Sequence, residues 1–445
     1  MTLKHKLLTF LILSLFIGSG AASAQEAKSD DLAASAALVS EFEVNGLKVI
    51  LKRRPGSPTV AGGVFVRGGA RNINEKNAGI EALTLAAAIE AGKNFPRQTV
   101  RRELAGMGSE IGAGSNNDYS AISLGTTRDN FDRFWNIFSD VVLNPAFAEA
   151  DINRVREQML TGLRERSTLP EGALETLDAR AIYAGHPYAN DVNGTVATIG
   201  AITANDIRAY HKKIMETSRL LLVVVGDIDH EALRSKVAAT FGKLPRGSYK
   251  EAAYPPLDFS KGTLDTIQRS LPTNYIKGSF AAPPPGTKDY YAMRVAISIL
   301  QTLVYQTVRQ QLQLSYAPDA EMDSFAANTA SISVSTTDPN KAVAVMREQI
   351  KLLQENTLRP DVIDQISSFF LTRHYIGQET SGAQAGEIAQ YELIGGGWRN
   401  AFLFMNGVRS VRPEDIRDVS NKYMKNLRFA YVGNTASIQR PVFLD

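Results

Sequence analysis

Histidine is the residue type that most directly suggests metal chemistry, and this sequence uses it sparingly. Beyond the first 24 residues, no two histidines lie within one helical turn of each other. A catalytic zinc site needs about three protein ligands and an open position, so only a fold that gathers distant side chains would bring these residues to one ion. We therefore expect ordinary surface histidines. The four are His186, His211, His230 and His374.

The chain contains no cysteine, which excludes disulfides, thiolate zinc sites, a cysteine nucleophile and a lipid-modified N-terminal cysteine. Its 445 residues are 44% hydrophobic, enough for large cores, and the length favours two or more domains. The formal net charge is +3, and it falls by two to +1 without Lys4 and Lys6. Nucleic-acid binding needs a clustered basic face, and this nearly neutral chain does not suggest one.

The N-terminus has the pattern of an export signal. Lys4 and Lys6 precede the apolar run Leu7–Ile17, and Ala22-Ser23-Ala24 is a small-residue cleavage site. The run is too short to span a bilayer comfortably, so we expect residues 1–24 to be removed after Ala24 and the mature protein to be periplasmic. Residues 25–37 are small and polar, which predicts a mobile leader.

Hydrophobic periodicity and turn residues predict the regular elements of the mature chain. We expect strands at 42–44 and 47–51 joined by an Asn45-Gly46 turn, further strands at 59–66, 109–115 and 119–126, a buried central strand at 220–225, and helices at 79–92, 99–106, 131–143, 149–166 and 204–215.

The pattern then starts again, which indicates a duplicated domain. Residues 120–127 resemble 330–337 at an offset of 210, Asp206-Ile207-Arg208 recurs as Asp415-Ile416-Arg417 at 209, and Val225-Gly226 recurs as Val432-Gly433 at 207. We expect an N-terminal domain at 38–243, a proline- and glycine-containing linker at 244–262, and a C-terminal domain at 263–445. Each copy mixes strands with helix pairs, so the predicted class is α+β: a mostly antiparallel sheet with helices on one face.

At this point the chain resembles the insulinase/pitrilysin family, in its bacterial processing-peptidase-like branch. The resemblance covers about residues 40 to 435 and implies two such domains that form half of a clamshell chamber. It is carried by the order and spacing of Gly68-Gly69, Gly79, Gly92, Gly108-Ser109-Glu110-Ile111, Asp118-Tyr119, Gly185-His186-Pro187 and Val225-Gly226-Asp227.

Active members carry His-x-x-Glu-His on the helix after Gly79, where two histidines bind zinc and the glutamate acts as general base. This sequence has Ala82, Leu85 and Ala86 at those positions, and Gly162 near the place of the distal glutamate ligand. The resemblance therefore implies a chain without zinc of its own. Nearby acidic side chains are expected to be solvated surface charges: Glu81, Glu90, Glu157 and Glu165.

The resemblance also implies a substrate-binding pair in the second half. Arg309 and Tyr316 lie seven residues apart, as in the family, where the two donors hold the substrate carbonyl and oppose the charge that develops on it. A helix-terminal arginine beside a core tyrosine is the alternative. The sequence departs from the family at Gln310, often acidic there, and at Gln313, usually glycine.

Two further segments are candidates for peptide contact. One is an edge strand that pairs with substrate backbone in active members, although a plain twisted strand is equally compatible. The other resembles the glycine-rich substrate-contacting loop of a noncatalytic processing subunit, and it lacks the lysine of a phosphate-binding loop. The first comprises Ser109, Glu110, Ile111, Gly112 and Ala113, and the second Gly395, Gly396 and Gly397.

The leading hypothesis is a noncatalytic subunit of a heterodimeric periplasmic zinc peptidase, with zinc in a homologous partner and Arg309 and Tyr316 supplied by this chain. The alternative is a nonhydrolytic peptide-binding or scaffold protein of the same fold, possibly homodimeric. A self-sufficient metallopeptidase is not favoured, because the metal-binding positions hold apolar residues.

Overall fold

The computed structural model describes residues 36–444, so the predicted signal peptide and nearly all of the predicted leader lie outside the described residues. From Val39 onward the described residues form one compact unit. Among the described residues, no helix combines the length and apolarity needed to cross a bilayer.

The first half contains a 6-stranded sheet in the order β1-β2-β6-β3-β5-β4. Only β2 and β6 run parallel; the other neighbours are antiparallel. Every residue of β6 is buried, which confirms the predicted central strand, and Asn45 and Gly46 form the predicted turn with positive φ angles. The strands are β1 (Val39–Val44), β2 (Leu47–Arg53), β3 (Thr59–Arg67), β4 (Glu110–Ser115), β5 (Tyr119–Thr127) and β6 (Leu220–Gly226).

Helices of the first half cover one face of this sheet and share a core around Phe134, Trp135, Phe138 and Phe241. They are α3 (Ile80–Ala88), α4 (Arg97–Met107), α5 (Phe131–Leu143), α6 (Glu149–Thr168), α8 (Val196–Ala201), α9 (Ala204–Ile214) and α10 (His230–Ala239). The remaining helix of this half, α7 (Pro170–Ile182), packs on the second sheet instead. The sequence did not predict α7, α8 or α10, and α3 ends four residues before Gly92.

The second half repeats the first. Its 5-stranded sheet has the order β7-β11-β8-β10-β9 with one parallel pair, β7 and β11, and so matches β2-β6-β3-β5-β4 strand for strand. This topology confirms the duplication inferred from the sequence. The strands are β7 (Thr263–Gln268), β8 (Asn274–Ala281), β9 (Asp319–Met322), β10 (Thr329–Thr336) and β11 (Arg428–Gly433).

The helices of the second half pack mainly on one face of its sheet, around Phe280, Met293, Leu300 and Phe429. They are α11 (Lys288–Val304), α12 (Pro339–Glu355), α13 (Pro360–Gly377), α14 (Ser381–Ile394), α15 (Phe404–Arg409), α16 (Pro413–Tyr423) and α17 (Arg440–Leu444).

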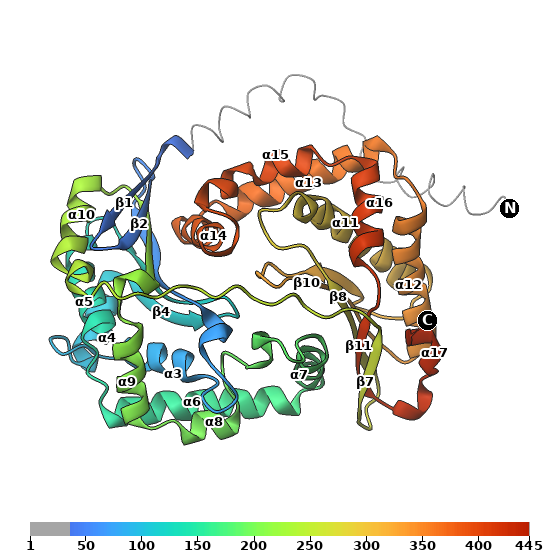
Figure 1. Ribbon diagram of the computed structural model, residues 1–445, viewed down its shortest axis with the longest axis horizontal. Helices are drawn as coiled ribbons and strands as arrows, with labels where there is room; N and C mark the ends of the chain where they lie inside the picture. Colours follow the sequence, from blue (N-terminus) through green and yellow to red (C-terminus); the bar gives the residue numbers. More distant parts are fainter. Residues whose placement is uncertain (1–35, 445) are drawn as a thin grey trace. The chain divides into compact units, whose positions relative to one another are not determined.

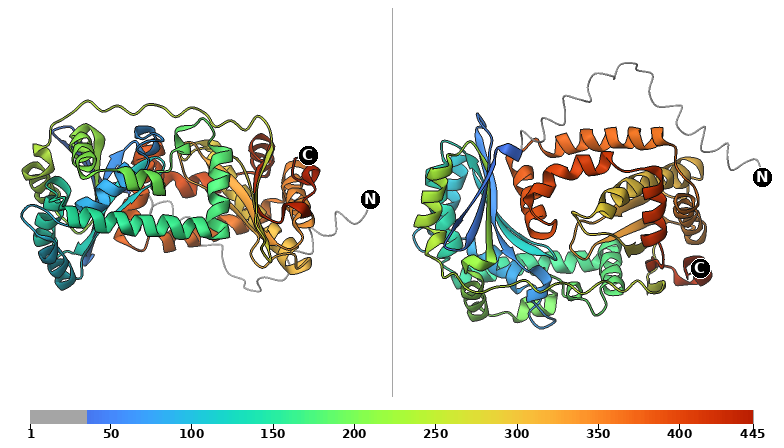
Figure 2. Two further views of the ribbon diagram at one scale, coloured as in Figure 1. Left: turned by 90° about the horizontal axis from the view of Figure 1, so that it is seen from below. Right: turned by 45° about the horizontal axis from the view of Figure 1, so that its top comes forward.

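The second face of each sheet is covered by a helix that belongs to the other half of the chain (Figures 1 and 2). Ala385, Ile388 and Ala389 of α14 pack on β2, β3 and β6 of the first sheet. In return, Ala173 and Leu174 of α7 pack on β11. The exchange buries faces that would otherwise be apolar and exposed, so the two sheets depend on each other for coverage.

Basic residues of β2, and Arg54 directly after it, hold α14 in place. Lys48 Nζ lies 2.6 Å from Glu392 Oε1, and Arg54 donates to the Ser381 hydroxyl at 2.9 Å. Between these contacts, Lys52 is buried with a pKa below its usual value because of burial. Burial raises the pKa of Glu387 to about 7, although Lys52 and a hydrogen bond from Gln378 oppose this shift.

Glu387 makes the stability of this contact depend on pH. Its folded pKa of about 7 lies above the ordinary value of 4.5, so its contribution to stability is full below about pH 4.5 and is lost as the pH rises through 7. Urea unfolding is expected to show a loss of at most about 3 kcal/mol from pH 5 to pH 8 through this group. The Glu387→Gln variant should show a smaller difference, whereas Glu355→Gln, at the exposed end of α12, should keep the wild-type difference. Equal pH dependence in wild type and Glu387→Gln would contradict this assignment.

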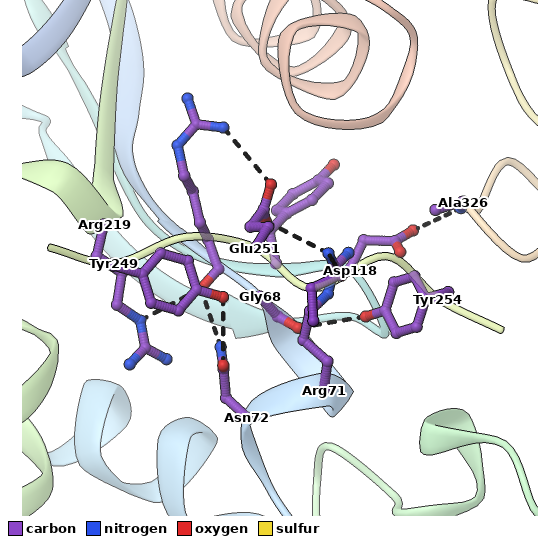
Figure 3. Close-up of polar contacts among 12 residues, drawn as sticks. Gly68, Arg71, Asn72, Asp118, Arg219, Tyr249, Glu251, Tyr254 and Ala326 are labelled. Carbon is purple, nitrogen blue, oxygen red and sulfur yellow. Dashed lines mark hydrogen bonds and ion pairs between the residues drawn. The ribbon is translucent and has the colours of Figure 1, made fainter.

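Residues 244–262, the predicted linker, contain no helix or strand, yet they are held firmly against the first half (Figure 3). Tyr249 donates to Asn72 Oδ1 at 3.2 Å, and Tyr254 donates to the Asn117 carbonyl at 2.7 Å. The Arg71 guanidinium lies 3.8 Å from the Tyr254 ring centre and donates to the Ala252 carbonyl. The segment is therefore an ordered strap rather than a free tether.

The β4–β5 turn of the first half meets the corresponding β9–β10 turn of the second. The Ala326 N–H donates to Asp118 Oδ2 at 3.0 Å (Figure 3), and the Ala327 N–H donates to the Tyr188 hydroxyl at 3.3 Å. Asp118 and Tyr188 are both buried and are hydrogen-bonded to each other. These contacts fix the position of β9 relative to the first half.

Candidate substrate-binding site

Gly79 is the N-cap residue of α3, and its backbone is left-handed, with φ of 84°. A Cβ at this position would also lie 2.5 Å from Ile199 Cδ1, so the site accepts only glycine. The helix that follows has the predicted metal-motif positions on it: Ala82 and Ala86 are half-buried, and Leu85 is 1% exposed. None of these side chains can ligate a metal or accept a proton.

The helix α6 packs beside α3, as the resemblance implied. Gly162 lies on its exposed side, and a Cβ there would have no atom within 4 Å. Glu157 and Glu165 are exposed, as expected. Within residues 36–444 no three histidine or carboxylate side chains are grouped to hold a metal, and the residues at these positions fit no zinc.

Glu81 is not the surface charge that the sequence suggested; it lies in the first turn of α3 and is only 3% exposed. Its carboxylate lies 3.1 Å from Arg219 Nη2 and accepts hydrogen bonds from Ser120 at 2.5 Å and Tyr210 at 2.8 Å. Burial raises the pKa of Glu81, and Arg219 with the two hydroxyls opposes that shift. This network ties α3 to β5, α9 and the start of β6.

Glu90 is also not a free surface charge. Burial alone would raise its pKa, but hydrogen bonds from Arg154 and Arg97 bring the pKa below its usual value. The Arg97 Nε atom lies 3.0 Å from Glu90 Oε2, and Arg154 comes from α6. The Glu90–Arg154 ion pair therefore fastens the segment after α3 to α6.

Two of the four histidines are buried, which corrects the expectation of surface residues. His186 Nδ1 accepts from the Tyr188 N–H at 3.1 Å, so its Nε2 carries the proton and donates to the Pro255 carbonyl at 3.2 Å. His211 Nε2 lies 2.9 Å from the Val142 carbonyl. Burial lowers the pKa of both, so both serve as neutral structural groups.

The structure brings Arg309 and Tyr316 together. Arg309 lies in a π-helix, Tyr305–Gln311, and its guanidinium stacks 3.9 Å from the Tyr316 ring centre while donating to the Tyr316 carbonyl. Tyr316 is 80% exposed, so it is not the core tyrosine of the alternative interpretation. The pair presents a phenol and the remaining guanidinium donors at the surface.

Gln313, the departure from the family's glycine, retains the backbone that glycine would favour. Its φ is 53°, in the left-handed region that costs most residues about 1 kcal/mol. The chain therefore turns between Arg309 and Tyr316 as a glycine-containing segment would, and the substitution does not separate the pair.

The edge strand β4 lies next to α3 and ends the first sheet. The Asn116 N–H donates to the Tyr119 carbonyl at 2.9 Å across the turn, so by strand alternation Ile111 and Ala113 direct their backbone groups away from β5. Glu110 and Gly112 face β5 with their backbone, and the Ser109 hydroxyl lies 2.8 Å from the Thr126 hydroxyl. This edge has the geometry for strand addition.

The glycine segment after α14 is packed more tightly than a mobile loop. The N–H groups of Gly395 and Gly397 both donate to the Tyr391 carbonyl, Gly395 is buried, and only Gly396 is exposed. Trp398, which begins η7 (Trp398–Leu403), is buried against the first sheet and donates to Glu41 at 2.9 Å. The glycine segment and Trp398 therefore extend the packing of α14 on the first sheet. Substrate contact by the three glycines stays a prediction.

Comparison with known proteins places similar sequences in one peptidase family. Residues 48–196 match the family model for insulinase (peptidase family M16), and residues 201–368 match the model for the peptidase M16 inactive domain. The chain is 22% identical over 386 residues to an uncharacterized zinc protease of Mycobacterium bovis, covering 84% of this chain and 88% of that one. It is 24% identical over 265 residues to mitochondrial cytochrome b-c1 complex subunit 1 of Bos taurus, covering 59% of this chain and 55%, about half, of that subunit.

Solved structures share the fold. A protease from Helicobacter pylori superposes with a TM-score of 0.80 at 16% identity, covering 89% of this chain and 99% of that one. The peptidase M16 inactive domain from Pseudomonas fluorescens also gives 0.80, at 19% identity, covering 90% and 99%.

Two similar α+β domains, with alanine and leucine at the metal-motif positions, define a peptidase-type fold without metal ligands at those positions. The chain belongs to the insulinase family, peptidase family M16. Its fold, with a second half that matches the family's inactive-domain model, supports a noncatalytic subunit.

Proposed function

We propose that this chain is the noncatalytic subunit of a heterodimeric zinc metallopeptidase that acts on peptides in the periplasm. It supplies Arg309 and Tyr316 to an active site whose zinc and general base belong to a homologous partner chain. The basic, apolar and small-residue pattern of residues 1–24 supports the export that this role requires.

The observation that carries the proposal is the exposed Arg309–Tyr316 pair in a chain with Ala82 and Ala86 on α3. The Tyr316 ring is held by stacking on the guanidinium, yet 80% of the residue is exposed. Preorganised donors stabilise a developing oxyanion most, because they need not reorient during the reaction. The free edge of β4 offers backbone groups for an extended substrate.

The test is a peptidase assay of this chain, the partner that carries His-x-x-Glu-His, and their mixture, on an internally quenched fluorescent peptide. We expect hydrolysis only in the mixture, inhibition by a chelator, and zinc in the partner alone. Hydrolysis by this chain in isolation that a chelator abolishes would overturn the proposal.

The second candidate is a nonhydrolytic peptide-binding or scaffold protein, possibly homodimeric. Similarity to a chain named as a subunit of the mitochondrial cytochrome b-c1 complex favours it, as does the absence of catalytic side chains on α3. In that case the mixture would not hydrolyse the peptide, whereas this chain alone would bind it and sediment as a dimer.

A further inference from the structure

Tyr316 presents its hydroxyl from an exposed loop, so the backbone of that loop decides where the hydroxyl lies. Residues 312–318 join the π-helix to β9 and contain no helix or strand, and Tyr316 itself is 80% exposed. A donor stabilises a developing charge best when it is preorganised. An effective Tyr316 therefore requires a loop that is attached to the rest of the fold.

Leu314, two residues before Tyr316, is where this loop is attached. Its N–H donates at 2.8 Å to the carbonyl of Val308, the residue directly before Arg309. Its carbonyl accepts from the Thr336 hydroxyl at 2.7 Å. Leu314 therefore connects the π-helix of Arg309, the loop of Tyr316 and the end of β10.

The backbone of Gln313 shows why this attachment is needed. Gln313 precedes Leu314 with a φ of 53°, a left-handed conformation that is unfavourable for residues with a Cβ. Such a conformation persists only where the surrounding structure holds it. The two hydrogen bonds of Leu314 supply that restraint, so the loss of either is expected to let the turn relax.

The Thr336 hydroxyl is committed to Leu314. Thr336 is the last residue of β10 and is 2% exposed. Its oxygen accepts from the Asp338 N–H at 3.1 Å. Its one hydrogen has two carbonyl acceptors within reach, that of Leu314 at 2.7 Å and that of Asp338 at 3.5 Å. The shorter contact takes the hydrogen, so the hydroxyl has both a donor and an acceptor partner.

Thr336 is itself fixed by the centre of the second sheet. Asn274, at the start of β8, donates to the Thr336 carbonyl at 3.1 Å. The side-chain oxygen of Asn274 accepts from the Tyr431 hydroxyl at 2.7 Å and from the Asn434 N–H at 2.9 Å. Asn274 and Tyr431 are both buried. A series of hydrogen bonds thus runs from β11 through β8 and β10 to the loop of Tyr316.

The internal duplication gives Thr336 a counterpart in the first half. Thr126 precedes it by 210 residues, the offset that relates residues 120–127 to 330–337. The Thr126 hydroxyl lies 2.8 Å from the hydroxyl of Ser109, directly before β4. Each threonine therefore holds the segment that precedes the last strand of its sheet, and in the second copy that segment carries Tyr316.

We propose that Thr336 is a positioning residue for the Tyr316 hydroxyl, which it holds toward the reacting carbonyl through its hydrogen bond to Leu314. Its side chain is buried, so it acts on the reaction through Tyr316 rather than by contact with substrate. The inference rests on the proposed function, because Tyr316 needs this placement only as a donor to the substrate.

Thr336→Val removes the hydroxyl and keeps the branched shape of the side chain. In the mixture with the zinc-bearing partner, kcat is expected to fall about tenfold while KM stays within about twofold, because the loop holds the donor in place for less of the time. Thr336→Ser keeps the hydroxyl and should retain a kcat within about twofold of wild type. If Thr336→Val does not fold, Thr336→Ala replaces it, since it also lacks the hydroxyl and adds no bulk.

Thr217→Val is the matched control. Thr217 is fully buried and also donates its hydroxyl to a backbone carbonyl, that of Asn45 at 2.6 Å, but it lies in the first half, at the start of β6. This variant should lose stability and keep the wild-type kcat. An equal fall of kcat in Thr217→Val and Thr336→Val would show a general effect of losing a buried hydroxyl and overturn the positioning role.

A double variant distinguishes positioning from general damage to the site. If Thr336 acts through the Tyr316 hydroxyl, Thr336→Val should lower kcat by less than about threefold in the Tyr316→Phe background, because the group that it positions is already absent. A further loss of about tenfold in that background would overturn the proposal.

Amide hydrogen exchange tests the attachment of the loop in this chain without a partner. Exchange at the Leu314 N–H is expected to be about tenfold faster in Thr336→Val and unchanged in Thr336→Ser, and the Ile332 amide of the same strand reports any general loss of stability. Equal exchange at Leu314 in wild type and Thr336→Val would overturn the attachment.

The two measurements separate this inference from the proposed function. Hydrolysis by the wild-type mixture that Thr336→Val does not lower overturns the positioning role and leaves the proposed function standing. No hydrolysis by the wild-type mixture, together with faster exchange at Leu314 in Thr336→Val, rejects the proposed function and supports the attachment of the loop by Thr336.

Discussion

Replacing Tyr316 by phenylalanine in the assembled peptidase is expected to lower kcat by about a hundredfold, the usual effect of removing one oxyanion donor. Arg309→Ala should lower it at least as much, because it removes a second donor and also the stacking that positions the Tyr316 ring at 3.9 Å. Donors that act in the transition state change kcat while leaving KM nearly constant. Steady-state kinetics on the quenched peptide measures both constants.

Tyr305→Phe is the matched control. Tyr305 lies on the same π-helix with the Arg309 guanidinium 5.3 Å from its ring centre, and it is 41% exposed. Its hydroxyl has no assigned role, so kcat should stay within twofold of wild type. An unchanged kcat for Tyr316→Phe and Arg309→Ala would remove this pair from the mechanism, even if the two chains hydrolyse the peptide together.

The largest expected effect on stability is that of Arg219→Met. This change leaves the Glu81 carboxylate buried without its counter-ion, which lowers the free energy of unfolding by about 3–5 kcal/mol at pH 8. It also removes a hydrogen bond to the Arg67 carbonyl and the stacking on Tyr249 of the strap. Chemical unfolding in urea, followed by circular dichroism, measures the difference.

The ionisation of Glu81 determines how the stability loss of Arg219→Met changes with pH. Burial holds the pKa of Glu81 above its ordinary value, and loss of Arg219 raises it further. A carboxyl with a raised folded pKa favours the folded state as the pH falls, so the defect should shrink at pH 5. The double variant Glu81→Gln/Arg219→Met should recover much of the loss, because neither charge is then buried.

Arg53→Met is the comparison for this variant. Arg53 also faces a carboxylate, Asp227, but its side chain is 55% exposed, and exposed pairs contribute about 0–1 kcal/mol. An Arg219→Met loss no larger than that of Arg53→Met would show that the buried pair does not stabilise α3.

The sequence predicted the elements whose signals are local. Asn45-Gly46 indicates a turn by itself, the continuous apolar run at Leu220–Val225 has the length of a buried strand, and the 207–210 offsets relate the second sheet to the first. It missed α7, because the surface that Leu174 covers belongs to β11, more than two hundred residues further on. A helix with few apolar residues gives little signal when its partner is distant.

The residues of the candidate site also fall into those that the sequence predicted and those that it did not. Arg309 and Tyr316 were predictable only through the family resemblance, because their spacing alone also fits a helix-terminal arginine beside a core tyrosine. Glu81 was misjudged because its burial depends on Arg219, 138 residues away. An arginine directly before the most apolar strand was the available signal, since a charge so placed needs a buried acid.

The exchange of α7 and α14 has a consequence for biogenesis. The strand β6 completes the first sheet at Gly226, but the helix that covers its second face begins only at Ser381, so the ribosome must add more than 150 residues before that sheet is enclosed. During this interval Phe65, Leu221 and Val223 remain open to solvent and to other chains. Neither half is therefore a self-contained folding unit, because each needs a helix of the other to cover its sheet.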